Sequence, residues 1–285
     1  MRSRLFCWLW AGLLGLLILG MPAAKAASTD SSEILQSLAS ADVMYLGETH
    51  DRPEDHQIQL EILQTLYQQK CQPSVSCLAI ALEMFQRPDQ DNIDQYLAGT
   101  LTEQQLLEQT QYQQRWGFPW EYYAPILRFA KEHQLPILAL NTPTEVTHKV
   151  ARQGLESLTP EEQTYIPPLT EIRTDNPEYR QMLLDSYQQH QGTHHASQNF
   201  ERFFTAQVLW DETMAEGIAQ FLKTQPNYQL LVLVGQAHIA YGYGIPSRVN
   251  RRLEQPLIQR SVLLSFPQAE SFPKDRLIAD FIWHL

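Results

Sequence analysis

Basic residues are scarce in this chain of 285 residues, which holds 21 Lys and Arg against 32 Asp and Glu. Residues 1–26 contain three of the basic residues and no acid, so the rest of the chain has 21 − 3 = 18 basic and 32 acidic residues, a net charge of −14. A surface this acidic repels nucleic-acid phosphates and anionic lipid headgroups. The composition therefore argues against nucleic acid or a membrane surface as the main partner, and an anionic ligand would need a locally cationic pocket.

The motifs of common hydrolases are also missing. No G-x-S-x-G nucleophile elbow occurs, and neither Cys71 nor Cys77 stands near a histidine in the sequence. The metalloprotease motif H-E-x-x-H is absent as well. These absences argue against serine or cysteine nucleophiles. Cys71 and Cys77 have no second Cys or His pair for a metal site, which leaves two alternatives, a short disulfide loop or two free thiols.

No cysteine stands directly behind the N-terminal apolar run, so a lipid-attachment site is lacking. The run from Leu5 to Leu19 follows Arg2 and Arg4 and precedes Ala24-Lys25-Ala26, which is typical of a cleaved secretory signal peptide, residues 1–26. An uncleaved anchor is the alternative, because about 18 to 20 apolar residues can span a bilayer. The small-residue ending favours cleavage. We therefore predict an exported protein, periplasmic or extracellular, without stable membrane insertion after cleavage.

No repeat of fixed period is present, and continuous apolar runs separated by helical patterns dominate the rest of the chain. Such runs are typical of strands that helices cover on both faces. The predicted strands are Val43–Leu46, Leu78–Leu82, Ile137–Leu140 and Leu230–Val234, with a fifth at Ser261–Ser265 and an edge strand within Leu277–Trp283. The pattern predicts an α/β fold with a mainly parallel β-sheet flanked by helices.

Helical patterns with recognisable ends lie between these strands. One helix is predicted to begin at Pro53, and the others cover Thr102–Gln114, Pro119–His133, Thr144–Arg152 and about Gln198–Lys223. Residues 155–195 differ, because prolines and a polar run interrupt short helical patches. We therefore predict an α/β core made of residues 27–154 and 226–285, and a smaller helical insertion or cap made of residues 155–225.

Polar side chains follow each of the first four predicted strands. In a parallel sheet the carboxyl ends of the strands lie at one edge, and ligands of open α/β folds bind there. The predicted cluster consists of Glu48, His50, Glu83, Asn141 and His238, with His56 one turn into the next helix. A single histidine behind a strand is more often structural, and acids at helix starts are often caps. Two tetrapeptides G-x-x-H, each directly behind a buried strand, favour a functional site, because each glycine lets the backbone turn close to a ligand.

Several chemistries fit this cluster, and the residues leave them open. Glu48, His50, Glu83 and His238 could hold zinc or another divalent metal. The same four residues could instead be catalytic, with His50 as a general base that activates water beside Glu48 or Glu83.

A planar cofactor between aromatic residues is the third alternative. Tyr241 and Tyr243, flanked by glycines, follow His238 closely, and tyrosinate is an iron ligand of haem. The aromatic stretch from Trp116 to Tyr123 is better explained by core packing. His194 and His195 could meet haem, although solvated loop histidines are the simpler interpretation.

Five segments between about residues 43 and 249 resemble the motifs of one known family and occur in the same order as in that family. They are GETHDRPEDH, ALEMFQRPDQ, WEYYAPILRFAKEHQLPILALNTP, AQVLWDETMAEGIA and VLVGQAHIAYGYGIPSRV. They look like the ChaN-like haem-binding lipoproteins, which are placed with the Tiki, TraB and erythromycin-esterase proteins in one superfamily. The resemblance implies a parallel-sheet domain with a smaller helical domain, and haem bound at a subunit interface through a tyrosine with histidine assistance. In other branches it implies hydrolysis, some of it metal-dependent.

The resemblance carries Glu48, His50, Glu83 and His238 over as motif positions. The secondary candidates from matching segments are His56, Arg87, Gln207 and Asp211. It does not place the iron-ligating tyrosine, so Tyr241 and Tyr243 both stay candidates. The missing lipid-attachment cysteine departs from the family pattern and argues for a soluble exported protein.

The main hypothesis is therefore an exported protein that binds haem or an iron porphyrin in haem or iron handling, with a homodimer left open. Its cofactor-binding candidates are His50, His56, Glu83, His238, Tyr241 and Tyr243. The cations expected to meet the propionates are Arg87, Arg248, Arg251 and Arg252. The competing hypothesis is a metal- or histidine-dependent hydrolase, so whether the protein is an enzyme also stays open.

Overall fold

The computed structural model describes residues 30–71, 77–191, 196–265 and 276–284, with the side chains of residues 189–199 left out. The predicted signal peptide lies outside the described residues. The same holds for His194 and His195.

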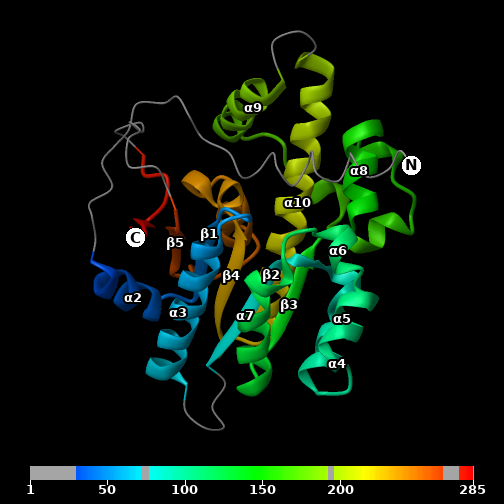
Figure 1. The fold of residues 1–285 in the computed structure, drawn as a ribbon. Coiled ribbons are helices and arrows are strands. Elements are labelled where there is room, and N and C mark those ends of the chain that lie inside the picture. Colours follow the sequence, from blue (N-terminus) through cyan, green and yellow to red (C-terminus); the bar gives the residue numbers. More distant parts are fainter. Residues whose placement is uncertain (1–29, 72–76, 192–195, 266–275, 285) are drawn as a thin grey trace.

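Six strands form one sheet in which every pairing is parallel, in the order β3-β2-β4-β1-β5-β6 (Figure 1). The strands are β1 Val43–Glu48, β2 Leu78–Gln86, β3 Ile137–Asn141, β4 Gln229–Gly235, β5 Gln259–Leu263 and β6 Phe281–Ile282. The predicted parallel α/β fold is confirmed. Every residue of β1 and β2 is buried, which explains why these strands are continuous apolar runs and do not alternate.

Helices cover both faces of the sheet. They are α2 Ser31–Ala39, α3 Pro53–Lys70, α4 Gln90–Leu97, α5 Glu103–Gln109, α6 Tyr112–Arg115, α7 Trp120–Glu132, α8 Thr144–Gln153, α9 Pro177–Gln191, α10 Ala196–Thr224 and α11 Ile245–Asn250. Met44 and Leu46 of β1 pack in one core with residues of α2, α3 and α7. Val43 and Tyr45, which point to the opposite face, pack with α10 and α11. We call these two sides the α3 face and the α10 face.

One predicted helix is shorter than expected. The capping box of Thr102 and Gln105 opens α5 as predicted, but α5 ends at Gln109 and not near Gln114. Gln111 has a left-handed backbone, with φ 49°, which breaks the helix before α6 begins at Tyr112. The sequence pattern carried no glycine or proline to announce this break.

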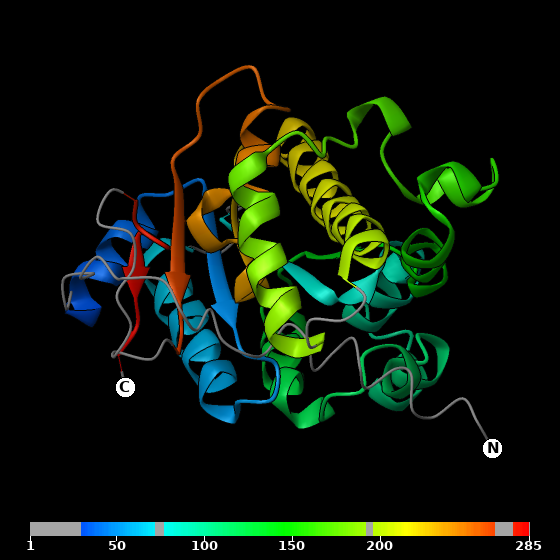
Figure 2. The same cartoon turned by 90° about the horizontal axis from the view of Figure 1, so that it is seen from above.

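The segment from residue 155 to 225 contains three short 3₁₀ turns, α9 and α10. Phe200 and Phe204 in the first half of α10 pack against Tyr179 of α9, and the two helices lie side by side above the carboxyl ends of the strands (Figure 2). Met214 and Ile218 in the second half of α10 belong to the core on the sheet. One helix thus joins the region above the strand ends to the sheet itself.

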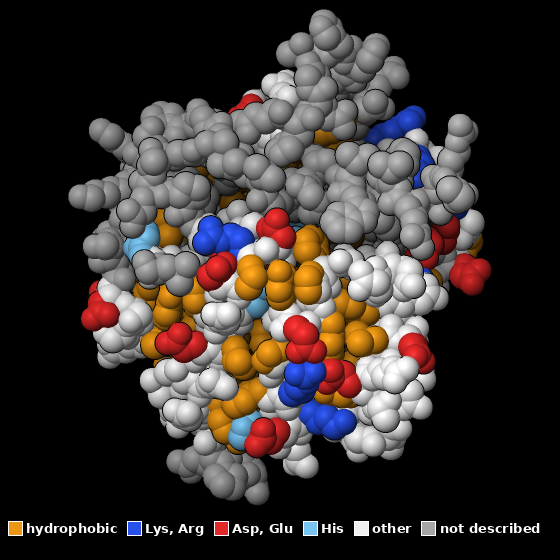
Figure 3. Space-filling view, viewed as in Figure 1, with side chains coloured by type: hydrophobic (Ala, Val, Ile, Leu, Met, Phe, Trp, Pro, Cys, Tyr) orange, Lys and Arg blue, Asp and Glu red, His pale blue; other side chains and the backbone are white. Residues whose placement is uncertain are grey.

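Cys71, at the end of α3, and Cys77, just before β2, form a disulfide. Over the face that contains α3 and α7, acidic and basic side chains lie among hydrophobic ones (Figure 3). Arg128 illustrates this mixing, because it pairs with both Glu103 and Glu121. Within the described ranges, no helix has the length and apolar character needed to cross a membrane.

Candidate functional site

The strand ends bring the predicted polar residues to one edge of the sheet. Glu48 ends β1 directly beside Gly235, which ends β4, and Glu83 lies near the end of β2. The predicted residues Glu48, His50, His56, Glu83, Asn141 and His238 are all buried, with exposed fractions between 0% and 8%. The cluster is therefore an internal network of charged and polar groups, and its function remains a prediction.

The first half of this network surrounds Glu48. Its Oε1 accepts hydrogen bonds from His50 Nδ1 at 2.7 Å and from the Tyr123 hydroxyl at 2.6 Å, and its Oε2 accepts one from Gln59 Nε2 at 2.6 Å. Burial alone would raise the pKa of Glu48, but the hydrogen bonds and the nearby His56 lower it to about 2. Glu48 is therefore held as a carboxylate.

His50 is oriented by the same contact. A carboxylate only accepts, so His50 carries a proton on Nδ1 and directs Nε2 away from Glu48. Burial lowers the pKa of His50, whereas the hydrogen bond to Glu48 and the charge of Glu83 outweigh it and raise the pKa. His56 supports this arrangement from α3, because its Nε2 donates to the His50 carbonyl at 3.1 Å and its ring stacks on Tyr122.

The second half surrounds His238, which is fully buried. His238 Nδ1 donates to Asp211 Oδ1 at 2.6 Å, and Asp211 Oδ2 accepts from the Tyr179 hydroxyl at 2.5 Å. His238 Nε2 lies 3.3 Å from Glu83 Oε1, close enough for an ion pair but outside hydrogen-bond geometry. Burial disfavours a charged His238, but Glu83 and Asp211 outweigh burial and raise its pKa to about 10. His238 is therefore a buried imidazolium at neutral pH.

Glu83 connects the two halves. Its Oε2 accepts a hydrogen bond from the Gly235 amide at 2.6 Å, and the charges of His238 and His50 lower its pKa against the effect of burial. A Cβ atom on Gly235 would lie 3.0 Å from His50 Nε2, so the glycine allows the imidazole to approach the backbone. The G-x-x-H pattern therefore serves this contact.

Buried polar atoms without partners lie at the same edge. His50 meets the Trp116 ring edge-on at 4.7 Å and the Phe118 ring at 5.2 Å. The buried atoms that make no hydrogen bond include Trp116 Nε1, Asn141 Oδ1, Thr142 Oγ1, Gln236 Oε1 and His238 Nε2. Folded proteins leave few such groups unpaired, so several near one sheet edge indicate a place for water or a ligand.

Tyr241 and Tyr243 lie just beyond this network. Tyr241 has a left-handed backbone, with φ 55°, and its ring stacks on that of Tyr243 at 5.4 Å. Its hydroxyl is buried without a hydrogen-bond partner. The Tyr243 hydroxyl instead accepts a hydrogen bond from Arg276 Nη1 at 3.2 Å, and the guanidinium lies over the Tyr243 ring. The two tyrosines therefore have different environments.

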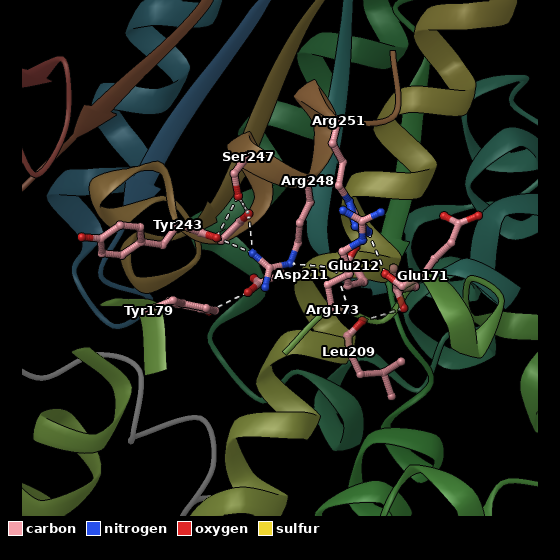
Figure 4. Close-up of polar contacts among 12 residues, drawn as sticks. Glu171, Arg173, Tyr179, Leu209, Asp211, Glu212, Tyr243, Ser247, Arg248 and Arg251 are labelled. Atoms are coloured by element: carbon pink, nitrogen blue, oxygen red, sulfur yellow. Dashed lines mark hydrogen bonds and ion pairs between the residues drawn. The ribbon is translucent and has the colours of Figure 1, made fainter. Parts of the chain in front are cut away.

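The arginines expected to supply free positive charge are engaged within the protein. Glu212, fully buried on α10, pairs with Arg248, Arg251 and Arg252 at 2.5 to 3.2 Å, and Figure 4 shows two of them converging on it. Arg248 also donates to the Tyr243 and Gly244 carbonyls. Arg87 pairs with Glu216 of α10 at 2.7 Å. Both acids lie in the family-resembling segment of α10, but only Gln207 and Asp211 were carried over from it as candidates.

Other partners were missed as well. Gln59, Tyr123 and Tyr179 complete the network. Tyr123 lies in the aromatic stretch that was explained by core packing, and Tyr179 lies in the region of interrupted helical patches, where no site residue was predicted. Gln59 carries a weak signal, since it lies one helical turn after His56. Asp211 and Gln207, both secondary candidates, do reach His238. Within the described part of the chain, no group of three or more His, Cys, Asp or Glu side chains could hold a metal ion.

The fold resembles that of solved proteins. ChaN of Campylobacter jejuni, described with cofacially bound haem, matches with a TM-score of 0.66 and 18% sequence identity over 85% of this chain and 90% of that chain. An erythromycin esterase mutant, EreC in its open conformation, has a TM-score of 0.47 and 14% identity over 82% of this chain and 72% of that chain.

Sequence comparison gives a relative and a family. Protein RETICULATA-RELATED 5, chloroplastic, of Arabidopsis thaliana is 26% identical over 94% of this chain, which spans only 37% of the length of that relative. The family model described as haem-binding uptake, Tiki superfamily, ChaN matches residues 34–249, a range that contains Glu48, His50, Glu83 and His238. This match confirms the resemblance, and the chain belongs to that haem-binding ChaN family of the Tiki superfamily.

Proposed function

We propose that this protein binds haem or a closely related iron porphyrin beside the strand ends, at the loop that holds Tyr243. The observation that carries this proposal is the family match over residues 34–249, which includes the strand-end network and this loop. The haem described for ChaN of Campylobacter jejuni agrees with it.

The residues present fit an iron porphyrin. Tyr243 is partly buried, lies at the edge of the core and offers a phenol oxygen, which is a known haem-iron ligand. Its hydroxyl accepts a hydrogen bond from Arg276, and a guanidinium is suited to a propionate. A bound haem would supply an iron centre, and Tyr243 would hold it through this phenol oxygen.

The buried histidines take another role in this proposal. His50, His56 and His238 are at most 4% exposed, so none of them lies on an open face. His238 ends the turn Gln236–His238, which is followed directly by the turn that holds Tyr241, and Asp211 and Glu83 fix its position. The network therefore positions the tyrosine loop and does not itself ligate iron.

We also place the protein outside the cytoplasm, with residues 1–26 as a cleaved signal peptide and a role in haem or iron handling. The disulfide between Cys71 and Cys77 supports this, because disulfides persist in oxidising compartments. A homodimer that joins two Tyr243 loops would provide an interface for haem. Size-exclusion chromatography with light scattering, with and without haemin, tests the dimer.

A haemin titration tests the main proposal. The wild-type protein should shift the Soret band with saturation near one haem per chain, and Tyr243→Phe should change the band and weaken binding about tenfold or more, because the phenolate ligand is lost. Tyr228→Phe is the matched control, since Tyr228 is a partly buried tyrosine next to β4. A wild-type spectrum in Tyr243→Phe would refute the ligand assignment. No spectral change in the wild type would refute haem binding.

A second candidate is a hydrolase with His50 as its general base. The favouring observation is that Glu48 holds the Nδ1 proton, while Nε2 makes no hydrogen bond to any described residue. Nε2 could then take a proton from water, with Glu48 stabilising the imidazolium, and the unpaired Trp116 indole N–H lies nearby as a donor. Ester and peptide substrates test it: His50→Gln should abolish any turnover, whereas His133→Gln should not. Equal rates in wild type and His50→Gln would refute it.

A further inference from the structure

A separate cavity lies away from the strand ends, on the α10 face of the sheet. Its volume is about 190 Å³, it opens to solvent beside the exposed Asp280, and it is lined by residues of β1, β5, the Tyr241 turn and residues 277–280. Its lining includes Tyr45, Tyr241, Pro246, Gln259, Ser261 and Asp280. At about 30 Å³ per water, the cavity can hold a molecule of roughly six non-hydrogen atoms.

The hydroxyl of Tyr241 is the unsatisfied group of this cavity. Tyr241 is 9% exposed, and its hydroxyl is buried without a hydrogen-bond partner. The Tyr45 hydroxyl, in contrast, donates to Gln259 Oε1 at 2.6 Å. Burial raises the pKa of both tyrosines, so both are neutral phenols. An unpaired buried phenol beside a cavity indicates a bound polar partner.

The charge of the cavity is set by the pairing of the strands. Ser261 pairs with Tyr45, so its side chain faces the α10 side of the sheet. There Asp280 accepts hydrogen bonds from the Ser261 amide and hydroxyl, both through its Oδ2 atom. Arg260 pairs with Met44 and faces the opposite side, where its guanidinium donates to Ser37 of α2. Asp280 is the one acidic residue among the described residues that line the cavity, and Arg260, which also lines it, turns its guanidinium toward Ser37.

We propose that this cavity binds a small organic cation with a primary ammonium group. Asp280 Oδ1 and the Tyr241 hydroxyl would accept the ammonium hydrogens, and the two tyrosine rings favour a cation by their electron-rich faces. The apolar Pro246, Ile278 and Ala279 would contact its alkyl part. The acidic surface of the protein also raises the local concentration of cations.

Binding of n-butylammonium chloride, followed by saturation-transfer NMR and calorimetry at constant ionic strength, tests the proposal. The wild-type protein should bind it saturably, with a dissociation constant in the millimolar range or below, whereas neutral n-butanol should bind at least about tenfold more weakly. Asp280→Asn should weaken binding about tenfold or more, and Tyr241→Phe about threefold or more, because each removes one acceptor. Asp91→Asn on α4, an exposed acid, should bind as the wild type does.

Several outcomes would overturn it: no saturable binding of n-butylammonium, equal binding of n-butanol, or wild-type affinity in Asp280→Asn. Asp280 also accepts a hydrogen bond from the Ser261 amide, so circular dichroism must show that Asp280→Asn is folded. If Asp280→Asn is unfolded, an unchanged affinity for n-butylammonium in Tyr241→Phe refutes the site. The cation proposal does not rest on haem binding, although Tyr241, which lines the cavity, stacks on Tyr243. A folded Asp280→Asn variant that loses both cation binding and the haemin spectrum would refute separate sites.

Discussion

The two histidines of the G-x-x-H segments follow strands in the same way, yet their surroundings differ. His50 has one carboxylate at hydrogen-bond distance, Glu48, and a second ring nitrogen without a described partner. His238 lies between Asp211 and Glu83, and both of its nitrogens face a carboxylate. The same G-x-x-H spacing therefore produces an oriented imidazole at His50 and a buried cation at His238.

This difference separates structural from functional roles. A histidine whose pKa is about 10 stays charged at neutral pH and is unsuited to proton transfer there. Its charge offsets two buried carboxylates and so stabilises the fold around the tyrosine loop. His50 keeps a ring nitrogen that makes no hydrogen bond to a described residue. Substitutions in the half around His238 should therefore cost more stability than matching substitutions in the half around His50.

The largest effect is expected for His238→Gln. The substitution leaves Asp211 and Glu83 buried without their shared cation, which should lower the free energy of unfolding by about 3–5 kcal/mol. Urea denaturation measures this loss. His133→Gln, a half-buried histidine packed on Tyr67 and Phe129, should cost about 1 kcal/mol or less. Similar losses in both variants would contradict the role of His238 as a buried counter-ion.

Two glycine substitutions sharpen the comparison at the backbone. A Cβ on Gly244 would lie 2.1 Å from the His238 carbonyl oxygen and 3.3 Å from Asp211 Oδ1, so Gly244→Ala must displace the backbone and should cost about 3 kcal/mol. A Cβ on Gly235 meets the His50 ring, a side chain that can move, and Gly235→Ala should cost about 1 kcal/mol. Thermal unfolding gives both losses, and NMR of the His50 ring should show displacement only in Gly235→Ala. A larger loss of stability in Gly235→Ala than in Gly244→Ala would contradict the assignment of the half around His238 as the more rigid one.

The sheet was predictable from the sequence because burial on both faces demands continuous apolar runs. Val43–Leu46 and Leu230–Val234 are such runs, and the structure pairs them as neighbours in the centre of the sheet. The polar residues that follow the strands were predictable for the same reason, since parallel strands place their carboxyl ends at one edge. The family resemblance added the order of the motifs.

The partners that decide the role of each histidine were harder to predict. Tyr123 and Tyr179 reach Glu48 and Asp211 from helices, where a tyrosine on an apolar stripe usually signals packing. The pairing of Glu212 with three arginines depends on the placement of α10 against α11, which periodicity alone does not fix. The sequence thus identified which groups meet at the edge but not which carboxylate faces which nitrogen.

Removing one tyrosine hydroxyl from each half gives a smaller, matched pair of effects. Tyr179→Phe takes away a donor from Asp211, which then depends mainly on His238, and should cost about 2 kcal/mol. Tyr123→Phe takes away a donor from Glu48, which keeps His50 and Gln59, and should cost about 1 kcal/mol while raising the pKa of Glu48. Chemical denaturation and carboxyl NMR titration measure these effects. Equal losses would show that the two carboxylates are equally well supported.

A small loss of stability, about 1 kcal/mol at pH 6, is expected for His50→Gln, because the amide can still donate to Glu48. The pH profile then decides which histidine carries the strongly raised pKa. The stabilisation of the fold by charged His238 is fully present below the ordinary histidine pKa of 6.5, and it is lost as the pH rises toward about 10. Stability from Glu48 is present above its ordinary pKa of 4.5 and is lost as the pH falls toward about 2.

Both contributions overlap between these two ordinary pKa values, so the wild type should be most stable between pH 4.5 and 6.5. Urea unfolding of His50→Gln across the alkaline range should still show most of the wild-type loss, because His238 remains between its two carboxylates. If the alkaline loss disappears in His50→Gln, His50 is the fixed cation of the pair. His238 would then be the residue with a nitrogen available for chemistry, and the roles of the two halves would be exchanged.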